Sequence, residues 1–241
     1  MYLNYVTAID KNYLPGLYAL CNSIRENASE CKLSCMVYGK DDLIKEVEKL
    51  GIEVIPNPPI GAEIPKCGRW ANPVEATWSK FLIPKLFKED ILWVDADSII
   101  LNKSERIKFN EPVGAINTNQ YTVGGAVGGL KQNIKKPALQ AGVLYFNIKR
   151  WNELSITEHC YEAMKLPYDY KYVDQSVLSY VLMGDFYQLP DNWHILANRR
   201  YYNDDELRTF KVFHYNGRNP WQEKLKNQEI WNRYARKEDR R

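Results

Sequence analysis

Strand and helix patterns alternate through the first quarter of the chain, and this alternation limits the fold more than any other feature. Segments rich in β-formers are separated by segments with apolar residues at helical spacing. The predicted strands are Tyr2–Ile9, Leu33–Tyr38 and Ile52–Ile55, and the predicted helices are Leu14–Ile24 and Asp41–Leu50. Strands joined through helices form parallel sheets with right-handed crossovers. The sequence therefore predicts an α/β fold, with a mixed but mainly parallel sheet flanked by helices.

The rest of the chain continues this pattern less regularly. A long loop rich in Pro and Gly is expected at Pro56–Pro73, and a Gly-rich link at Val123–Leu130. Further strands are predicted at Ile91–Val94, Val113–Asn117, Gly142–Asn147, Asp185–Leu189 and Lys211–Phe213. Further helices are predicted at Val74–Phe87 (kinked or split near Pro84), Thr157–Leu166, Asp174–Met183 and Trp221–Arg236. Because the sequence shows no clean domain boundary, we expect one domain over residues 1–222, followed by a C-terminal helix and basic tail over 223–241.

Composition excludes several classes of protein. The 33 basic and 30 acidic side chains nearly cancel, which argues against a nucleic-acid partner. No apolar run approaches the ~20 residues of a membrane span, and the first residues read as a strand rather than a signal peptide. The five cysteines have no C-x-x-C spacing, which favours free thiols over a zinc site. These features predict a cytoplasmic protein without a transmembrane segment.

The most informative motif is an acidic pair, Asp95 and Asp97, directly after the predicted strand Ile91–Val94. Ligands of open α/β sheets bind at the carboxyl ends of strands, and paired carboxylates suit Mg²⁺ or Mn²⁺. An acidic turn, with Asp97 capping the next segment, is the structural alternative. The motif also resembles that of haloacid-dehalogenase-type phosphatases. Those enzymes carry it on their first strand, whereas about ninety residues precede it here.

Five other stretches follow the same order as motifs of a known family. They are Ala8–Tyr13, Thr77–Lys80, Gln140–Asn147, Val173–Leu178 and His214–Trp221. Together with the acidic pair, they make the chain resemble the retaining glycosyltransferases of family 8, the glycogenin and lipopolysaccharide galactosyltransferase group. The resemblance covers roughly residues 1–222 and implies a GT-A (Rossmann-like) fold, a UDP-sugar donor and a divalent metal, Mn²⁺ with Mg²⁺ as the alternative.

The resemblance implies a nucleotide site in the first loop. Tyr13 would stack on uracil, Asp10 and Asn12 would make polar contacts, and Ala8 would line the same site. From the residues alone, Asp10 or Asn12 could equally cap the following helix.

The resemblance also assigns phosphate contacts. Lys80 would lie against the diphosphate, although a solvated helix face is the alternative for a single lysine. Ala96, Gly217 and Arg218 complete the implied nucleotide-binding set. The last motif is one residue shorter than in the family and lacks the family's lysine, so Arg218 is the available cation.

Donor-sugar contacts are implied for Gln140, Ala141, Gly142, Asp174 and Gln175. Asp174 and Gln175 are the implied catalytic residues, Asp174 orienting the donor and Gln175 lying opposite the leaving group. Gln140 stands where the family usually has Asn. As alternatives, Gly142 could mark a bulge and Asp174 could be a helix N-cap.

Imidazole chemistry has three candidates, His159, His194 and His214. By resemblance, His214 is the third protein ligand of the metal beside Asp95 and Asp97. His159 falls in a predicted surface helix and is expected to be solvated. His194 lies near the family's acceptor side, with packing or capping as the alternative.

The sequence thus predicts a metal-dependent retaining transferase that moves a hexose or pentose from a UDP-sugar to a glycan or other hydroxyl acceptor. A catalytically degenerate nucleotide-sugar-binding module is the main alternative, and a phosphatase the second. The basic tail could touch an anionic membrane surface, although its interleaved Glu238 and Asp239 also fit a frayed, solvated helix end.

Overall fold

The computed structural model describes residues 2–65, 75–130 and 134–240. It contains two compact units, which we describe separately. The first comprises Met1–Pro58, Leu92–Ile107 and Pro190–Arg241, and the second comprises Pro59–Ile91 and Lys108–Leu189.

The main sheet of the first unit has the strand order β4-β1-β2-β3. The strands are β1 (Asn4–Ile9), β2 (Leu33–Val37), β3 (Glu53–Pro56) and β4 (Ile91–Val94). β1 pairs in parallel with β2, and β2 with β3. Nearly every residue of β1, β2 and β4 is buried, and their sequences are mostly apolar, as expected for a parallel sheet that is covered on both faces. α1 (Leu14–Asn27) and α2 (Asp41–Glu48) are the connecting helices, and a short 3₁₀ turn (Lys11–Tyr13) precedes α1.

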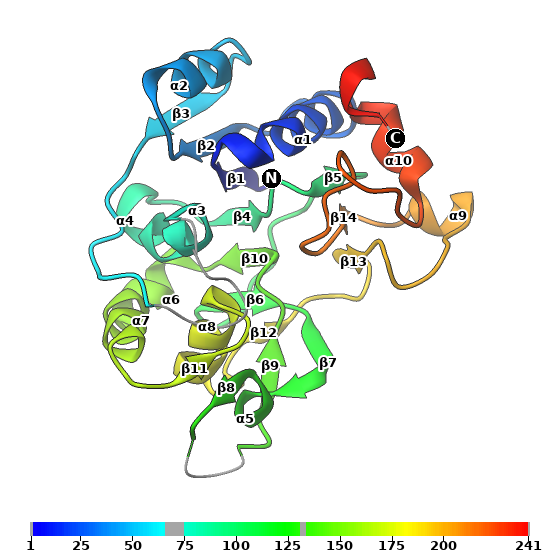
Figure 1. Cartoon of the computed structure of the whole chain (residues 1–241). Helices are drawn as coiled ribbons and strands as arrows, with labels where there is room; N and C mark the ends of the chain where they lie inside the picture. Colours follow the sequence, from blue (N-terminus) through cyan, green and yellow to red (C-terminus); the bar gives the residue numbers. More distant parts are fainter. Residues whose placement is uncertain (1, 66–74, 131–133, 241) are drawn as a thin grey trace. The chain divides into compact units, whose positions relative to one another are not determined.

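A second sheet of this unit has the order β13-β14-β5 (Figure 1). Its strands are β5 (Ser98–Ile100), β13 (His194–Leu196) and β14 (Val212–His214). β14 lies in the middle, parallel to β13 and antiparallel to β5. α9 (Asp204–Leu207) lies between β13 and β14 in the chain, and α10 (Gln228–Tyr234) follows β14, with a final 3₁₀ turn at Lys237–Asp239. α10 packs against α1, as Figure 1 shows.

The second unit contains the strand order β12-β6-β10, in which β6 is antiparallel to β10 and parallel to β12. Two small antiparallel pairs, β7–β9 and β11–β8, accompany it. The strands are β6 (Val113–Ala115), β7 (Asn117–Thr122), β8 (Val127–Gly128), β9 (Pro137–Leu139), β10 (Val143–Phe146), β11 (Asp169–Tyr170) and β12 (Tyr187–Gln188). The helices are α3 (Glu75–Trp78), the 3₁₀ helix η2 (Ser79–Leu82), α4 (Ile83–Leu86), α5 (Val123–Ala126), α6 (Ile148–Glu153), α7 (Ile156–Met164) and α8 (Asp174–Leu182).

These elements confirm the predicted fold class, a mixed α/β fold whose sheet is mainly parallel and flanked by helices. The predicted first three strands and two helices are all present. Whether residues 1–222 form one domain with a separate helix and tail remains a prediction.

Three predicted elements differ from the structure. The helix predicted at Trp221–Arg236 begins only at Gln228, because Asn227 is held in a left-handed conformation (φ 54°) while its side chain donates to the carbonyls of Ala197 and Arg200. The helix predicted up to Phe87 is divided into α3, η2 and α4, with Pro84 in the first turn of α4. The division next to Pro84 was predicted, whereas the one at Ser79 was not. The start of that helix, Val74, lies outside the described residues.

The link predicted at Val123–Leu130 contains α5 and β8 instead. Thr122 caps α5 by accepting from the backbone N–H of Gly125, which supplies a helix start where glycines suggested only a loop.

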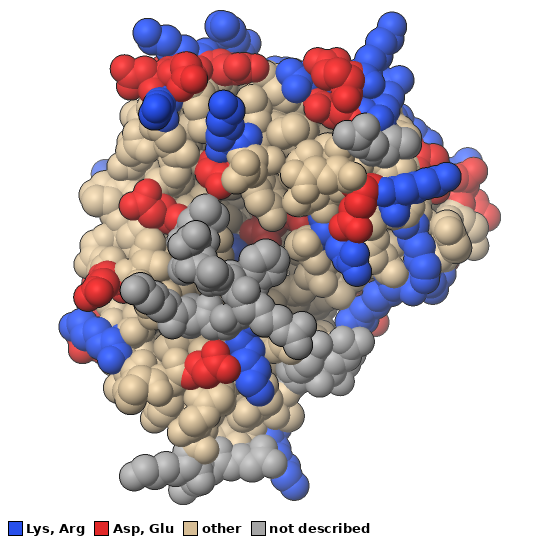
Figure 2. All heavy atoms as spheres, in the orientation of Figure 1, with Lys and Arg blue, Asp and Glu red and all other residues tan. Residues whose placement is uncertain are grey.

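Four cysteines are free thiols, as expected: Cys21, Cys31, Cys35 and Cys160. The expectation for Cys67, and part of the loop predicted at Pro56–Pro73, lie outside the described residues. Figure 2 shows Lys and Arg interspersed with Asp and Glu over the face in view. Among the described residues, no helix is long and apolar enough to cross a membrane.

Candidate functional site

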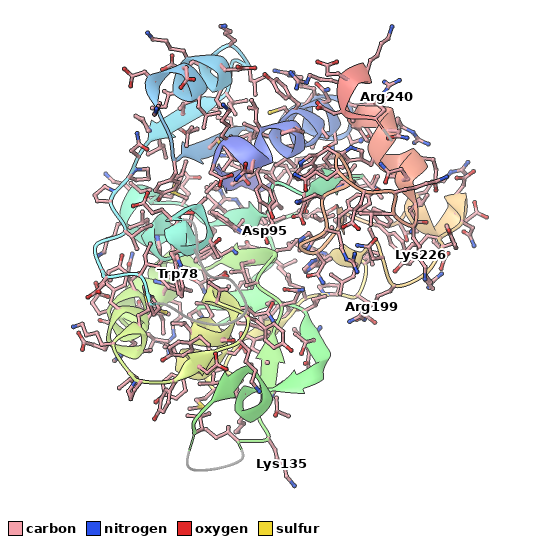
Figure 3. The ribbon with its side chains drawn as sticks, viewed as in Figure 1. Trp78, Asp95, Lys135, Arg199, Lys226 and Arg240 are labelled. Atoms are coloured by element: carbon pink, nitrogen blue, oxygen red, sulfur yellow. The ribbon has the colours of Figure 1, made fainter. Side chains whose placement is uncertain are left out.

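The acidic pair lies in the short connection between β4 and β5 of the first unit, where Figure 3 labels Asp95. Backbone and side-chain donors hold both carboxylates. Trp93 Nε1 donates to Asp95 Oδ1 at 2.8 Å, and the backbone N–H of Gly217 donates to Asp97 Oδ2 at 2.8 Å. The side chain of Asp95 is 30% exposed, whereas that of Asp97 is 2% exposed. The pair therefore has one buried and one accessible carboxylate.

The third side chain is His214, the last residue of β14. The pairing of His214 with Ser98 of β5 brings its imidazole beside the acidic pair. His214 Nε2 lies 3.1 Å from Asp97 Oδ1 and 3.8 Å from Asp95 Oδ2. One ligand atom from each of the three residues lies within 4.8 Å of the others, so the set is spaced to hold a metal ion.

The chemistry of these three donors fits a divalent cation. Burial alone would raise the pKa of the Asp97 carboxyl, but attraction to His214, its hydrogen bond and the Gly217 N–H lower that pKa below its ordinary value. Asp97 is thus a carboxylate at neutral pH. Two carboxylates and one imidazole nitrogen form a mixed oxygen–nitrogen set of the type that suits Mn²⁺ and tolerates Mg²⁺.

Gly217 has the backbone conformation that this hydrogen bond needs. Its φ of +71° lies in the left-handed region, which a residue with a Cβ enters at a cost.

Arg218, the predicted phosphate-binding cation, has a 60% exposed side chain and pairs with Glu223 at 3.1 Å.

Tyr13, the predicted uracil-stacking residue, is half-buried next to this site. Its ring contacts that of Trp221 edge-on, with centroids 5.4 Å apart. Burial raises the pKa of Tyr13, and the negative charges of Asp97 and Asp95 raise it further. An aromatic pair therefore lies within electrostatic reach of the acidic pair. Trp221 was in a motif of the sequence but was not predicted as a site residue.

The predicted polar contacts of the first loop also have a local role. Asp10 accepts from the Asn12 backbone N–H at 2.9 Å and from Asn12 Nδ2 at 3.2 Å, so it caps the 3₁₀ turn. Asn12 is exposed and Asp10 half-buried. Ala8 is buried in β1, opposite Met36 of β2.

Gly16 of α1 is a site residue that sequence reasoning missed. A Cβ at this position would lie 2.6 Å from the carbonyl oxygen of Ala96, the residue between the two aspartates. Only glycine allows α1 this close to the loop. A glycine in the first turns of a predicted helix was the available signal.

His194 was also missed as part of this site. It is 2% exposed, and its Nε2 lies 2.9 Å from His214 Nδ1. A side chain as buried as that of His194 is poorly placed to contact an acceptor substrate. His159 is exposed on α7, as expected.

The second unit holds the predicted donor-sugar and catalytic residues. Lys80 Nζ pairs with Asp174 Oδ2 at 2.7 Å, and both side chains are buried, at 4% and 8% exposure. Lys80 is therefore not on a solvated helix face. Asp174 begins α8 but is not its N-cap, which is Val173. Val173 has φ 53° and ψ −123°, an unusual conformation for a β-branched residue, directly before Asp174.

Gln175 also contacts the turn before β10. The backbone N–H of Ala141 donates to Gln175 Oε1 at 3.2 Å. Gln140 is buried, and its N–H donates to the carbonyl of Ile116 at 2.9 Å. Ala141 and Gly142 form a turn before β10 rather than a strand. The structure thus brings together the predicted residues of this unit.

Comparisons with known proteins agree with this fold. A family model described as "Glycosyl transferase family 8" matches residues 4–224. No curated protein matches the chain in sequence.

Three of the solved structures to which this chain is similar are described as glycosyltransferases. The bifunctional glycosyltransferase WbbM in its apo form is 17% identical with a TM-score of 0.70, over 97% of this chain and 49% of that one. The apo form of GlyE from Streptococcus pneumoniae TIGR4 is 17% identical with a TM-score of 0.65, over 97% of this chain and 60% of that one. The galactosyltransferase LgtC, in complex with donor and acceptor sugar analogues, is 17% identical with a TM-score of 0.63, over 92% of this chain and 91% of that one. The chain thus spans about half the length of WbbM and 60% of GlyE. The likeness identifies a GT-A fold, as predicted.

Proposed function

Since this chain belongs to glycosyl transferase family 8, we propose that it is a metal-dependent glycosyltransferase. In this proposal it transfers a hexose or pentose from a UDP-sugar to a hydroxyl group of a glycan or other acceptor, with retention of anomeric configuration. The LgtC structure with donor and acceptor sugar analogues supports the two classes of substrate.

The observation that carries the proposal is the cluster of Asp95, Asp97 and His214, whose ligand atoms lie within 4.8 Å of one another. These three side chains would hold Mn²⁺ or Mg²⁺. When bound, such an ion supplies Lewis-acid stabilisation to the diphosphate that leaves the sugar.

The neighbouring aromatic and polar groups support a nucleotide at the same place. Tyr13 would stack on the uracil, with Trp221 supporting its ring from the edge. Asp10 and Asn12 lie in the loop that leads to Tyr13, and their polar side chains would contact the nucleotide. Asn12 donates two hydrogen bonds to the carboxylate of the half-buried Asp10. We propose Ala8, Ala96 and Gly217 as backbone and lining contacts of that nucleotide.

Retention is proposed to follow from the residues of the second unit. Gln175 carries an amide, which is a poor nucleophile, so a covalent enzyme intermediate is disfavoured. The acceptor hydroxyl would instead attack from the face that the leaving phosphate occupies, and would pass its proton to a phosphate oxygen. Asp174 would orient the sugar, with Gln140, Ala141 and Gly142 as further donor contacts and Lys80 as a cation for the diphosphate.

A panel of UDP-sugars tests the proposal. The wild-type protein is incubated with each UDP-sugar and Mn²⁺, and released UDP is measured with and without EDTA. We expect Mn²⁺-dependent release with at least one UDP-sugar, loss of release in Asp97→Asn, and near wild-type release in His159→Gln. No release with any sugar nucleotide would contradict the proposal. A transferred product of inverted configuration, determined by NMR, would contradict retention alone.

One observation favours the second candidate, a nucleotide-sugar-binding module without catalysis. Arg218, which would replace the family's lysine, pairs with Glu223 at 3.1 Å. UDP binding by calorimetry without turnover of any UDP-sugar would favour this module. Release of phosphate from p-nitrophenyl phosphate without UDP would favour a phosphatase instead.

A further inference from the structure

We propose that His194 is a positioning residue that fixes the tautomer and ring orientation of His214, so that the Nε2 lone pair of His214 faces Asp95 and Asp97. This inference rests on the proposed function, because it concerns the same metal site. It assigns a role to a buried histidine that none of the proposed catalytic steps uses.

The strand register sets the two imidazoles against each other. Leu196 of β13 pairs with His214 of β14, and His194 pairs with Val212. His194 and Leu196 are two residues apart on β13, so their side chains point to the same face of the sheet. Leu196 pairs with His214, and His214 therefore lies on that face too, diagonally opposite His194. Their ring centroids are 5.1 Å apart at an interplanar angle of 30°.

The backbone of His214 is fixed, but its ring is not fixed by the backbone. β14 is the middle strand between β13 and β5, and the His214 carbonyl accepts from Ala197 N at 2.8 Å. These backbone hydrogen bonds do not restrict the χ2 rotation of the His214 imidazole. Two contacts restrict that rotation from opposite edges of the ring: His214 Nε2 lies 3.1 Å from Asp97 Oδ1, and His214 Nδ1 lies 2.9 Å from His194 Nε2.

The same contact determines where one proton lies. Two ring nitrogens at 2.9 Å share a single proton, carried by one and accepted by the other. A metal on His214 Nε2 needs the lone pair of that atom, so the proton of a neutral His214 is on Nδ1. His194 Nε2 must then accept, and His194 carries its own proton on Nδ1. Metal-binding histidines commonly donate the N–H of their second ring nitrogen to an acceptor, usually a carboxylate, a backbone carbonyl or water, and His194 Nε2 is in position to be that acceptor here.

Packing alone does not account for His194. Its Nδ1 has no hydrogen-bond partner among the described residues, and the side chain is 2% exposed. A buried polar atom without a partner costs stability, which an apolar side chain of similar size would avoid. Among the described residues, the hydrogen-bonding contact of the His194 ring is with His214.

A matched pair of variants tests the role. His194→Gln places an acceptor near the position of Nε2, whereas His194→Met fills similar space without one. Mn²⁺ binding, measured by EPR with the metal alone, is expected to weaken about 10–100-fold in His194→Met and by less than about 10-fold in His194→Gln. Circular dichroism and thermal melting check that both variants fold.

Three outcomes are distinguishable. If the wild type does not bind Mn²⁺, the proposed metal site and this inference both fail. If His194→Met binds Mn²⁺ as tightly as the wild type, or His194→Gln is as weak as His194→Met, the positioning role fails and the proposed function stands.

A second measurement needs no variant of uncertain folding. In ¹⁵N-histidine-labelled wild type with Zn²⁺ as a diamagnetic probe, long-range ¹H–¹⁵N spectra report which nitrogen carries each proton. Both His214 and His194 are expected to be protonated on Nδ1 alone, with His159 assigned through His159→Gln. An unprotonated Nδ1 on metal-bound His214 would overturn the inference.

Discussion

At the scale of single residues, the acidic loop depends on close contacts from three directions. Trp93 holds Asp95 from the side of β4, and Gly217 holds Asp97 from the segment after β14. Gly16 of α1 leaves room for the carbonyl of Ala96 between them. The loop is therefore fixed by neighbours rather than by its own sequence.

Replacement of Asp97 by Asn keeps the size of the side chain and removes one charged ligand. We expect a loss of about 10²-fold or more in kcat/KM, the magnitude of losing one preorganised electrostatic group. Mn²⁺ affinity, measured by EPR, should fall with it. His159→Gln on the exposed surface of α7 is the control, and equal losses in both variants would argue against a metal role for Asp97.

Gly16→Ala should disturb the loop without touching any ligand. Alanine favours a helix by about 1 kcal/mol, but overpacking costs about 1–3 kcal/mol. Its Cβ would meet the Ala96 carbonyl oxygen at 2.6 Å, so overpacking should prevail. Urea unfolding should show a net loss of stability, and Mn²⁺ binding should weaken. Gly125→Ala in α5, whose nearest neighbour would be 3.6 Å away, should be neutral.

At the scale of elements, pairs of side chains tie short helices to their neighbours. The pair of Lys80 on η2 with Asp174 on α8 is almost fully buried. Removing one partner of a buried pair is more costly than removing both, because the remaining charge keeps its desolvation penalty.

Lys80→Met should therefore lower the free energy of unfolding by about 3–5 kcal/mol. The double variant Lys80→Met/Asp174→Asn should recover part of that loss. Lys85→Met is the control, since the pair of Lys85 with Glu158 spans 3.8 Å and is more than half exposed on both sides. Urea unfolding measures all three, and equal losses in the single and double variants would contradict the argument.

The helix α10 is held by its aromatic residues. Trp231 is fully buried in a cluster with Phe213, Tyr215 and Trp221. Trp231→Ala should cost about 3–5 kcal/mol, whereas Arg233→Ala on the exposed face of the same helix should change little. Thermal melting compares the two, and similar melting temperatures would mean that α10 adds little to the fold.

At the scale of the whole molecule, buried thiols and phenols give the protein a limit at alkaline pH. Burial raises the pKa of Cys21 to about 12 and that of Cys35 well above its ordinary value. Burial also raises the pKa of Tyr161 to about 12. Each of these groups is held neutral in the folded state.

Stability should therefore fall as the pH rises. In the unfolded chain a thiol ionises near pH 8.5, so its contribution is complete below about pH 8.5. Above that value the folded state binds more protons than the unfolded chain, and each buried thiol costs about 1.4 kcal/mol per pH unit until its folded pKa is reached. Tyr161 contributes in the same way only above about pH 10, where an unfolded phenol ionises. Urea unfolding between pH 8 and 10 measures the slope. Cys35→Ala should make it shallower, and an unchanged slope would contradict this assignment.

The fold class and the acidic pair could be predicted from the sequence because they depend on local patterns, whereas the other candidate site residues were predicted by resemblance to the family. Alternation of strand and helix signals fixes a parallel sheet, and the residues after β4 follow directly from it. Asp95, Asp97 and His214 were all predicted, His214 by resemblance to the family. The split near Pro84 was also predicted, but the short strands β5 and β13 and the further division of that helix at Ser79 were not, because pieces of three or four residues carry almost no periodicity.

What the sequence determined by itself is the chemistry available: two carboxylates after a buried strand, three histidines and an aromatic-rich chain. Only the tertiary structure decided which histidine lies beside the carboxylates and which histidine contacts the first one. The pairing of β14 with β5 places His214 beside Asp97, and its pairing with β13 places His194 behind it. β5 and β14 are about a hundred residues apart in the chain, and β13 and β14 are about twenty apart. The register between such separated strands depends on packing of the whole unit, and no local pattern in the chain encodes it.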